Sequence, residues 1–166
     1  MPGKKQNAQA AIEYLTTYGW AIIIISVSLA ALYYLGVFNP ATYVSTSCLF
    51  PADFNCISSV LYPNGTLVIN LEQSTTSPIN ITAIGCNSNE TLTHMVSFAS
   101  APIPLLIGSN ITISGNSTVP LQCWENDTVF TGKPGGIFHG YILLNYTDVD
   151  TGYGHTIPAT VLEKVV

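Results

Sequence analysis

An uncharged run of 25 residues, from Tyr14 to Phe38, is the feature that most constrains how this chain can fold. About 20 predominantly apolar residues are enough for a helix to cross the hydrocarbon core of a bilayer. The run is apolar around its whole circumference, as expected of a helix surrounded by lipid or by other helices. We therefore expect one hydrophobic helix from Gln9 to Phe38, about 45 Å long, against a membrane core of about 30 Å.

The residues around the start of this helix form a pattern. Lys4 and Lys5 provide a basic leader, Ala8 is small, and the sequence Gln-Ala-Ala-Ile-Glu runs from Gln9 to Glu13. This pattern resembles the class III signal peptide of archaeal prepilins, which belong to the type IV pilus superfamily. The resemblance implies that a prepilin peptidase removes the leader, residues 1–8, by cutting between Ala8 and Gln9 on the cytoplasmic side. The hydrophobic helix, residues 9–38, would stay attached.

Glu13 has a chemical role in this interpretation. A charged side chain within a membrane helix costs roughly 2 to 3 kcal/mol at mid-membrane, so it normally has a partner. Cutting before Gln9 creates an α-amino group, and opposite charges within about 4 to 6 Å favour both ionised forms. We expect Glu13 to pair with the amine of a neighbouring subunit, which would favour assembly and fix the register.

Several alternatives stay open at this end of the chain. A cut before Gln6 would place Ala10 at mature position five and lose the glutamate from that position. An N-terminal Gln9 can also cyclise and lose its charge, which would leave Glu13 accepting hydrogen bonds. Glu13 would otherwise gain only about 0.3 to 1 kcal/mol from the helix dipole. A cleaved secretory signal is disfavoured because the apolar stretch is too long and no A-x-A site follows.

After Asn39-Pro40 the composition changes to Ser, Thr, Asn, Gly and Pro between short β-branched runs. Residues 39–166 are ample for one extracellular domain with its own core. The runs predict short strands at a spacing typical of an immunoglobulin-like β-sandwich, so the expected fold class is α+β. The predicted strands are 66–71, 78–84, 95–99, 103–107, 110–113, 118–123, 136–147 and 155–165. The last two would form a hairpin around a turn at 148–154.

Four cysteines lie beyond the hydrophobic helix. An even number in an exported domain predicts disulfides. Three connectivities are possible. Pairing of Cys48 with Cys56 and of Cys86 with Cys123 is favoured, because the first pair spans a short loop and the second can tie two strands together.

Seven asparagines of this domain each begin an N-x-[ST] sequon with Thr at the third position. Composition alone would give about two such sequons, so the excess predicts N-glycosylation. Sugars would solvate a surface in a chain of which only 8% is charged. The alternative is that Asn-x-Thr is ordinary composition for turns and exposed strand faces. The seven are Asn64, Asn80, Asn89, Asn110, Asn116, Asn126 and Asn145.

The charge balance disfavours one class of partner. Four Lys or Arg against nine Asp or Glu give a net charge of −5, and loss of Lys4 and Lys5 with the leader would make it −7. An acidic chain without arginine is a poor match for nucleic acid. The leader lysines also orient the helix, because basic residues stay on the cytoplasmic side, so the β-domain would be exported.

Patterns for catalysis or metal binding are weak. His94, His139 and His155 are scattered, and the cysteines contain no C-x-x-C pair. Asp148 and Asp150 resemble the start of a calcium loop but lack the later ligands of an EF-hand, so a hairpin turn is favoured. We expect no enzyme activity, no metal and no cofactor.

These features together predict the structural subunit of an archaeal type IV-like pilus. The prepilin would wait in the cytoplasmic membrane and then polymerise through its helix into a glycosylated extracellular filament. The resemblance implies surface adhesion as the purpose. It also implies four partners, namely copies of the chain, the prepilin peptidase, a pilus assembly platform and its ATPase. The alternatives are a cell-surface glycoprotein anchored by its helix, and a minor pilin or pseudopilin with a sugar-binding head.

Overall fold

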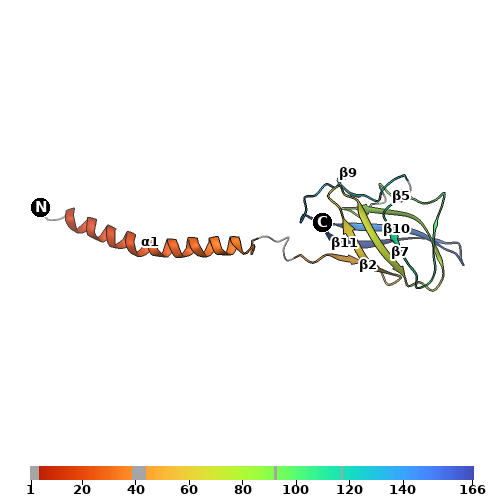
Figure 1. Ribbon diagram of the computed structural model, residues 1–166, viewed down its shortest axis with the longest axis horizontal. Coiled ribbons are helices and arrows are strands. Elements are labelled where there is room, and N and C mark those ends of the chain that lie inside the picture. The colour runs from red at the N-terminus through yellow and green to blue at the C-terminus, as the bar shows by residue number, and fades with distance from the viewer. Residues whose placement is uncertain (1–3, 39–43, 92, 117) are drawn as a thin grey trace. The chain divides into compact units, whose positions relative to one another are not determined.

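The computed structural model of this chain describes residues 4–38, 44–91, 93–116 and 118–166. The chain divides into an N-terminal helical unit and a β unit that begins at Val44. One apolar helix and a mostly β remainder make the α+β fold class correct at this level (Figure 1). Residues 1–3 of the expected leader and 39–43 of the expected domain lie outside the described residues.

Helix α1 (Lys4–Tyr34) forms most of the described N-terminal unit. It begins five residues before the expected start at Gln9, so the helical conformation extends into the expected leader. The stretch Ile12–Tyr34 contains an 18-residue window with a mean hydropathy of 1.9 and is long and apolar enough to cross a membrane. Residues 22–25 are four successive isoleucines, each more than half exposed, and four residues complete a helical turn. Apolar side chains therefore surround the helix on all sides.

The end of α1 differs from the expected end at Phe38, and Gly36 is the reason. The N–H of Gly36 donates to the carbonyl of Tyr33 at 3.0 Å, and the N–H of Val37 donates to the carbonyl of Leu32 at 3.2 Å. These two bonds form a Schellman motif, which satisfies carbonyls in the last helical turn. The motif needs a left-handed residue, and Gly36 supplies it with φ of 72°.

The β unit contains two sheets (Figure 1). The smaller sheet consists of β2 (Phe54–Leu61), β3 (Leu67–Gln73) and β7 (Asn110–Ile113), in that order. The larger sheet consists of β1 (Ser47–Leu49), β4 (Ile79–Asn87), β5 (Val96–Ser97), β6 (Ile103–Leu105), β8 (Cys123–Glu125), β9 (Thr128–Val129), β10 (Ile137–Asp148) and β11 (Gly154–Lys164). Its order is β1-β11-β10-β4-β8-β9, with β5 and β6 also paired to β4. The pairing of β4 with β8 is parallel, and the other named strand pairs are antiparallel.

Buried apolar side chains of both sheets form one core cluster. Alternate residues of β3 are buried, which is the period of two expected where one strand face meets a core. The edge of the Phe54 ring from the smaller sheet packs on Tyr146 from the larger sheet, with centroids 5.3 Å apart. Fully buried members are Leu61, Leu67, Ile69, Leu71, Ile81, Ile84, Leu121, Ile142 and Leu144.

Seven of the eight predicted strands overlap strands of the structure, while one is wrong and three strands were not predicted. The expected C-terminal hairpin is present, with β10 and β11 paired from Ile137 with Lys164 to Thr147 with Gly154. The expected strand 118–123 is wrong except at its last residue, and β1, β2 and β9 are missing from the prediction. Strand β2 was not predicted because its register shifts after Cys56, and this shift breaks the alternation of buried and exposed residues.

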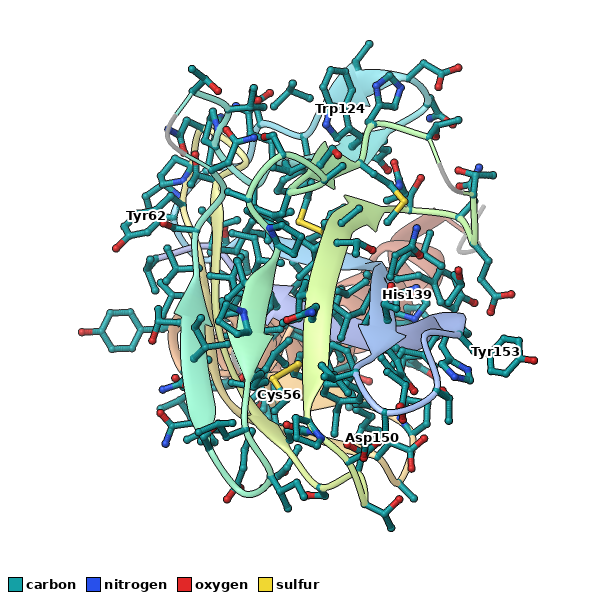
Figure 2. All side chains as sticks on the ribbon, turned by 90° about the vertical axis from the view of Figure 1, so that its right-hand side faces the viewer. Cys56, Tyr62, Trp124, His139, Asp150 and Tyr153 are labelled. Carbon is teal, nitrogen blue, oxygen red and sulfur yellow. A yellow bond between two sulfur atoms is a disulfide. The ribbon has the colours of Figure 1, made fainter. Side chains whose placement is uncertain are left out.

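All four cysteines are in disulfides, and these are the two pairs that the sequence favours. Cys48 of β1 bonds Cys56 of β2 and so joins the two sheets, with Cα atoms 5.9 Å apart (Figure 2). Cys86 of β4 bonds Cys123 of β8, and these residues are also direct neighbours across the parallel strand pair.

Glu163, on the core face of β11, is a carboxylate with only 3% of its surface exposed. Its Oε1 accepts a hydrogen bond from the Ser59 hydroxyl of β2, so the contact links the two sheets. Burial raises the pKa of Glu163 above its ordinary value of 4.5, and the hydrogen bond from Ser59 opposes this rise. Folding therefore favours the protonated acid.

Replacing Glu163 by glutamine is expected to stabilise the β unit at pH 7. The stability that protonation of Glu163 contributes is complete below pH 4.5 and is lost as pH rises through the raised pKa. A neutral amide avoids that loss, and we expect a gain of about 1 kcal/mol in the free energy of unfolding at pH 7. Urea unfolding of the full chain in detergent at pH 5 and pH 7, followed by near-UV circular dichroism, measures this.

Glu72→Gln on β3 is the matched control, because the Glu72 carboxylate receives its hydrogen bond from Asn55 at an exposed site. That variant should leave the pH dependence unchanged. A Glu163→Gln protein no more stable than the parent at pH 7 would contradict the expectation.

Candidate assembly and modification sites

Glu13 is exposed on α1, and both Ala8 and Gln9 of the expected cut lie within the same helix. Residues four apart lie on one helix face, so Gln9 and Glu13 are one turn apart on the same side. No side chain that the structure describes donates a hydrogen bond to the Glu13 carboxylate.

Three hydroxyl groups on α1 are satisfied within the helix. Thr17 Oγ1 donates to the carbonyl of Glu13 at 2.9 Å, and Ser28 Oγ donates to the carbonyl of Ile24 at 2.8 Å. Thr16 makes the same kind of bond one turn back. Such bonds let hydroxyls enter apolar surroundings, where unsatisfied polar groups are costly. The one charged group between Ile12 and Tyr34 is the Glu13 carboxylate.

The seven sequon asparagines differ in exposure. Four are exposed and three are half-buried. The exposed ones lie in the loops around β2, β4 and β8 and at the start of the edge strand β7. They are Asn64, Asn89, Asn110 and Asn126.

Two of the half-buried asparagines, Asn116 and Asn145, use their side chains inside the domain. Asn116 Nδ2 donates to the carbonyl of Ser97 at 3.1 Å. Asn145 lies in β10, where its Nδ2 is 3.9 Å from the Met95 sulfur and its buried Oδ1 has no hydrogen-bond partner among the described residues. An N-linked sugar is joined to Nδ2, so the four exposed asparagines are the better acceptors in the folded domain. Asn80, the third half-buried asparagine, lies in β4.

The three histidines lie apart, each against a different aromatic ring. His94 stacks on Trp124 with centroids 3.9 Å apart, and its Nε2 is 3.2 Å from Asp127. His139 contacts Tyr141. Across the residues with described side chains, no group of three His, Cys, Asp or Glu is arranged to hold a metal ion.

Asp148 forms the turn of the β10–β11 hairpin. Its Oδ1 accepts the N–H groups of Asp150 and Thr151, both at 2.9 Å, and its Oδ2 accepts the Ser77 hydroxyl. The bond from Ser77, followed by those around Thr151, lowers the pKa of Asp148 below its ordinary value. This carboxylate is therefore held ionised. Figure 2 shows Tyr153 of the same turn projecting away from the domain, on the side of Asp150.

No protein-family model matches the chain, and a search of curated proteins gives no match. Inferences about its function therefore rest on its own residues.

Proposed function

We propose that this chain is the structural subunit of an archaeal type IV-like pilus. The supporting observation is helix α1, which carries exposed apolar side chains on all sides and a single charge, Glu13, between Ile12 and Tyr34. Burying one large aliphatic side chain contributes about 1.5 to 3 kcal/mol, so this helix needs lipid before assembly and neighbouring helices afterwards. Packing against copies of itself satisfies that need without any catalysis by the chain.

Maturation supplies the partner for Glu13. In this proposal a prepilin peptidase removes residues 1–8, and the new amine at Gln9 of one subunit pairs with Glu13 of its neighbour. A buried charge without a partner is strongly unfavourable, and two paired charges offset each other. The pairing therefore selects the packed filament over the isolated subunit in the membrane, and it fixes the register between subunits.

The β unit is proposed to form the outer surface of the filament as an immunoglobulin-like sandwich. The core shared by the two sheets and the Cys48–Cys56 bond between them support this assignment. Glycans on the exposed asparagines would supply hydration to the surface. A pilus assembly platform and its ATPase would extract the subunit from the membrane, and the finished filament would serve adhesion at the cell surface.

Mass spectrometry of filaments sheared from cells tests the proposal. We expect the N-terminal peptide to begin at Gln9, in either its free or its cyclised form. The same digest should carry glycans at Asn64, Asn89, Asn110 and Asn126 more completely than at Asn145, whose amide faces Met95.

A chain that keeps Met1 and is found only in membranes would overturn the filament assignment and leave a surface glycoprotein anchored by its helix. A start at Gln6 would retain the filament but would remove the proposed role of Glu13. A chain present only in trace amounts among other filament subunits would identify a minor pilin or pseudopilin.

A further inference from the structure

A polar hollow of about 210 Å³ lies at the end of the β unit that carries the β10–β11 turn. Four segments that are distant in sequence line it. Asp53 precedes β2, residues 74–77 connect β3 to β4, Tyr146 and Asp148 end β10, and His155 begins β11. Two carboxylates and four Ser or Thr residues thus meet at one place, and the lining includes no lysine or arginine.

Tyr146 is the residue that distinguishes this hollow from an ordinary acidic surface. Only 6% of its surface is exposed, and its ring is held between Phe54, 5.3 Å away, and His155, which stacks on it at 5.1 Å. Its hydroxyl makes no hydrogen bond with the side chains and backbone that the structure describes. Burial, followed by the charges of Asp53 and Asp148, raises the pKa of Tyr146, so its hydroxyl stays neutral.

A tyrosine hydroxyl can both donate and accept a hydrogen bond, and Tyr146 lines the hollow. The domain retains this hydroxyl at the mouth of a hollow, on a ring that is fixed from two sides. The neighbouring Asp148 is equally fixed, because Ser77 and two backbone N–H groups hold its carboxylate. These groups are arranged before any ligand arrives, which reduces the entropy cost of binding.

The chemistry of the lining restricts the ligand. Carboxylates accept hydrogen bonds, the hydroxyls of tyrosine, serine and threonine both donate and accept, and the His155 ring offers an exposed flat surface. A ligand rich in hydroxyl groups matches all three. An anionic ligand would face two carboxylates without a compensating cation, which costs several kcal/mol. A metal ion is disfavoured because, among the described residues, no group of three His, Cys, Asp or Glu is arranged to hold one. The Oδ2 atom of Asp148 accepts one hydrogen bond, from Ser77, so it can accept another from a ligand.

We infer that this hollow binds a saccharide that carries no acidic group, with hydrogen bonds from its hydroxyls to Asp53, Asp148 and Tyr146. Either a neutral sugar or an amino sugar has the required chemistry. The inference goes beyond filament formation and does not depend on it, because the hollow belongs to one β unit.

Binding of the full chain in lipid nanodiscs to an array of neutral, amino and uronic-acid-containing oligosaccharides tests the inference. We expect binding to neutral or amino sugars and none to the acidic ones. Tyr146→Phe removes only the hydroxyl and should weaken binding about tenfold, because the sugar loses one hydrogen-bond partner. Asp148→Asn should weaken it at least as much, since an amide is a poorer acceptor than a carboxylate.

Tyr153→Phe is the matched control, because it removes a tyrosine hydroxyl from the same hairpin at a position that is 72% exposed. It should bind like the parent. Absence of binding across the array would overturn the inference, and so would binding that Tyr146→Phe and Asp148→Asn leave unchanged.

Calcium titration in the same nanodiscs provides a further test. If the parent binds calcium but no saccharide, and Asp148→Asn loses the calcium binding, the hollow is a cation site instead. Because the nanodisc sample is unassembled, each result is independent of whether filaments form.

Discussion

Glu13→Ala is expected to abolish filaments while the chain is still inserted in the membrane and cut. In the assembly that we propose, the carboxylate is the partner of the N-terminal amine of a neighbouring subunit. Removing one member of a buried charge pair leaves the other uncompensated, which costs about 3 to 5 kcal/mol. That cost recurs at every subunit contact along a filament, so polymerisation should stop rather than weaken.

Electron microscopy of sheared material and immunoblotting of the sheared and membrane fractions measure this effect. Ser28→Ala is the matched control, because it removes a hydroxyl from the same helix that is already bonded to the carbonyl of Ile24. It should leave filament yield unchanged. Glu13→Gln should fall between the two, because an amide accepts hydrogen bonds but carries no charge. Abundant filaments from Glu13→Ala would refute the pairing role.

Removing the Cys86–Cys123 bond by replacing both residues with alanine is expected to cost about 4 kcal/mol of stability in the β unit. The bond closes a loop of 37 residues, and closing a loop of this length restricts the unfolded chain strongly. Both cysteines are fully buried in the core, so the lost side-chain volume adds to the effect. This is a large part of the stability of an ordinary domain.

The second disulfide provides an internal comparison. Cys48 and Cys56 are separated by 8 residues and are half-buried, so their double alanine variant should lose only about 2.5 kcal/mol. Urea unfolding of both variants and the parent, in the same detergent, ranks the three proteins. Equal losses, or a larger loss for the Cys48–Cys56 variant, would contradict the expected order.

Local patterns in the sequence were sufficient to predict α1, the C-terminal hairpin and the Cys48–Cys56 pair. Each depends on neighbouring residues: a long apolar run, two β-rich segments around one turn, and a short loop between Cys48 and Cys56. The helix end shows how far such patterns extend. Gly36 was visible in the sequence, but the apolar residues after it suggested continuation, and its left-handed conformation ended the helix earlier.

The tertiary structure decided what depends on residues far apart in the chain. Strand β2 exists because it pairs with β3 in spite of its shifted register, and Asn145 is half-buried because it lies inside a sheet rather than at its edge. The hollow joins Asp53 to Tyr146 and His155, which about 100 residues separate. Sequence alone determined the helix and the single charge of its stretch Ile12–Tyr34, because hydropathy and length act locally. Only the folded domain brought a carboxylate, a buried hydroxyl and an aromatic ring together, because non-local strand pairing sets those distances.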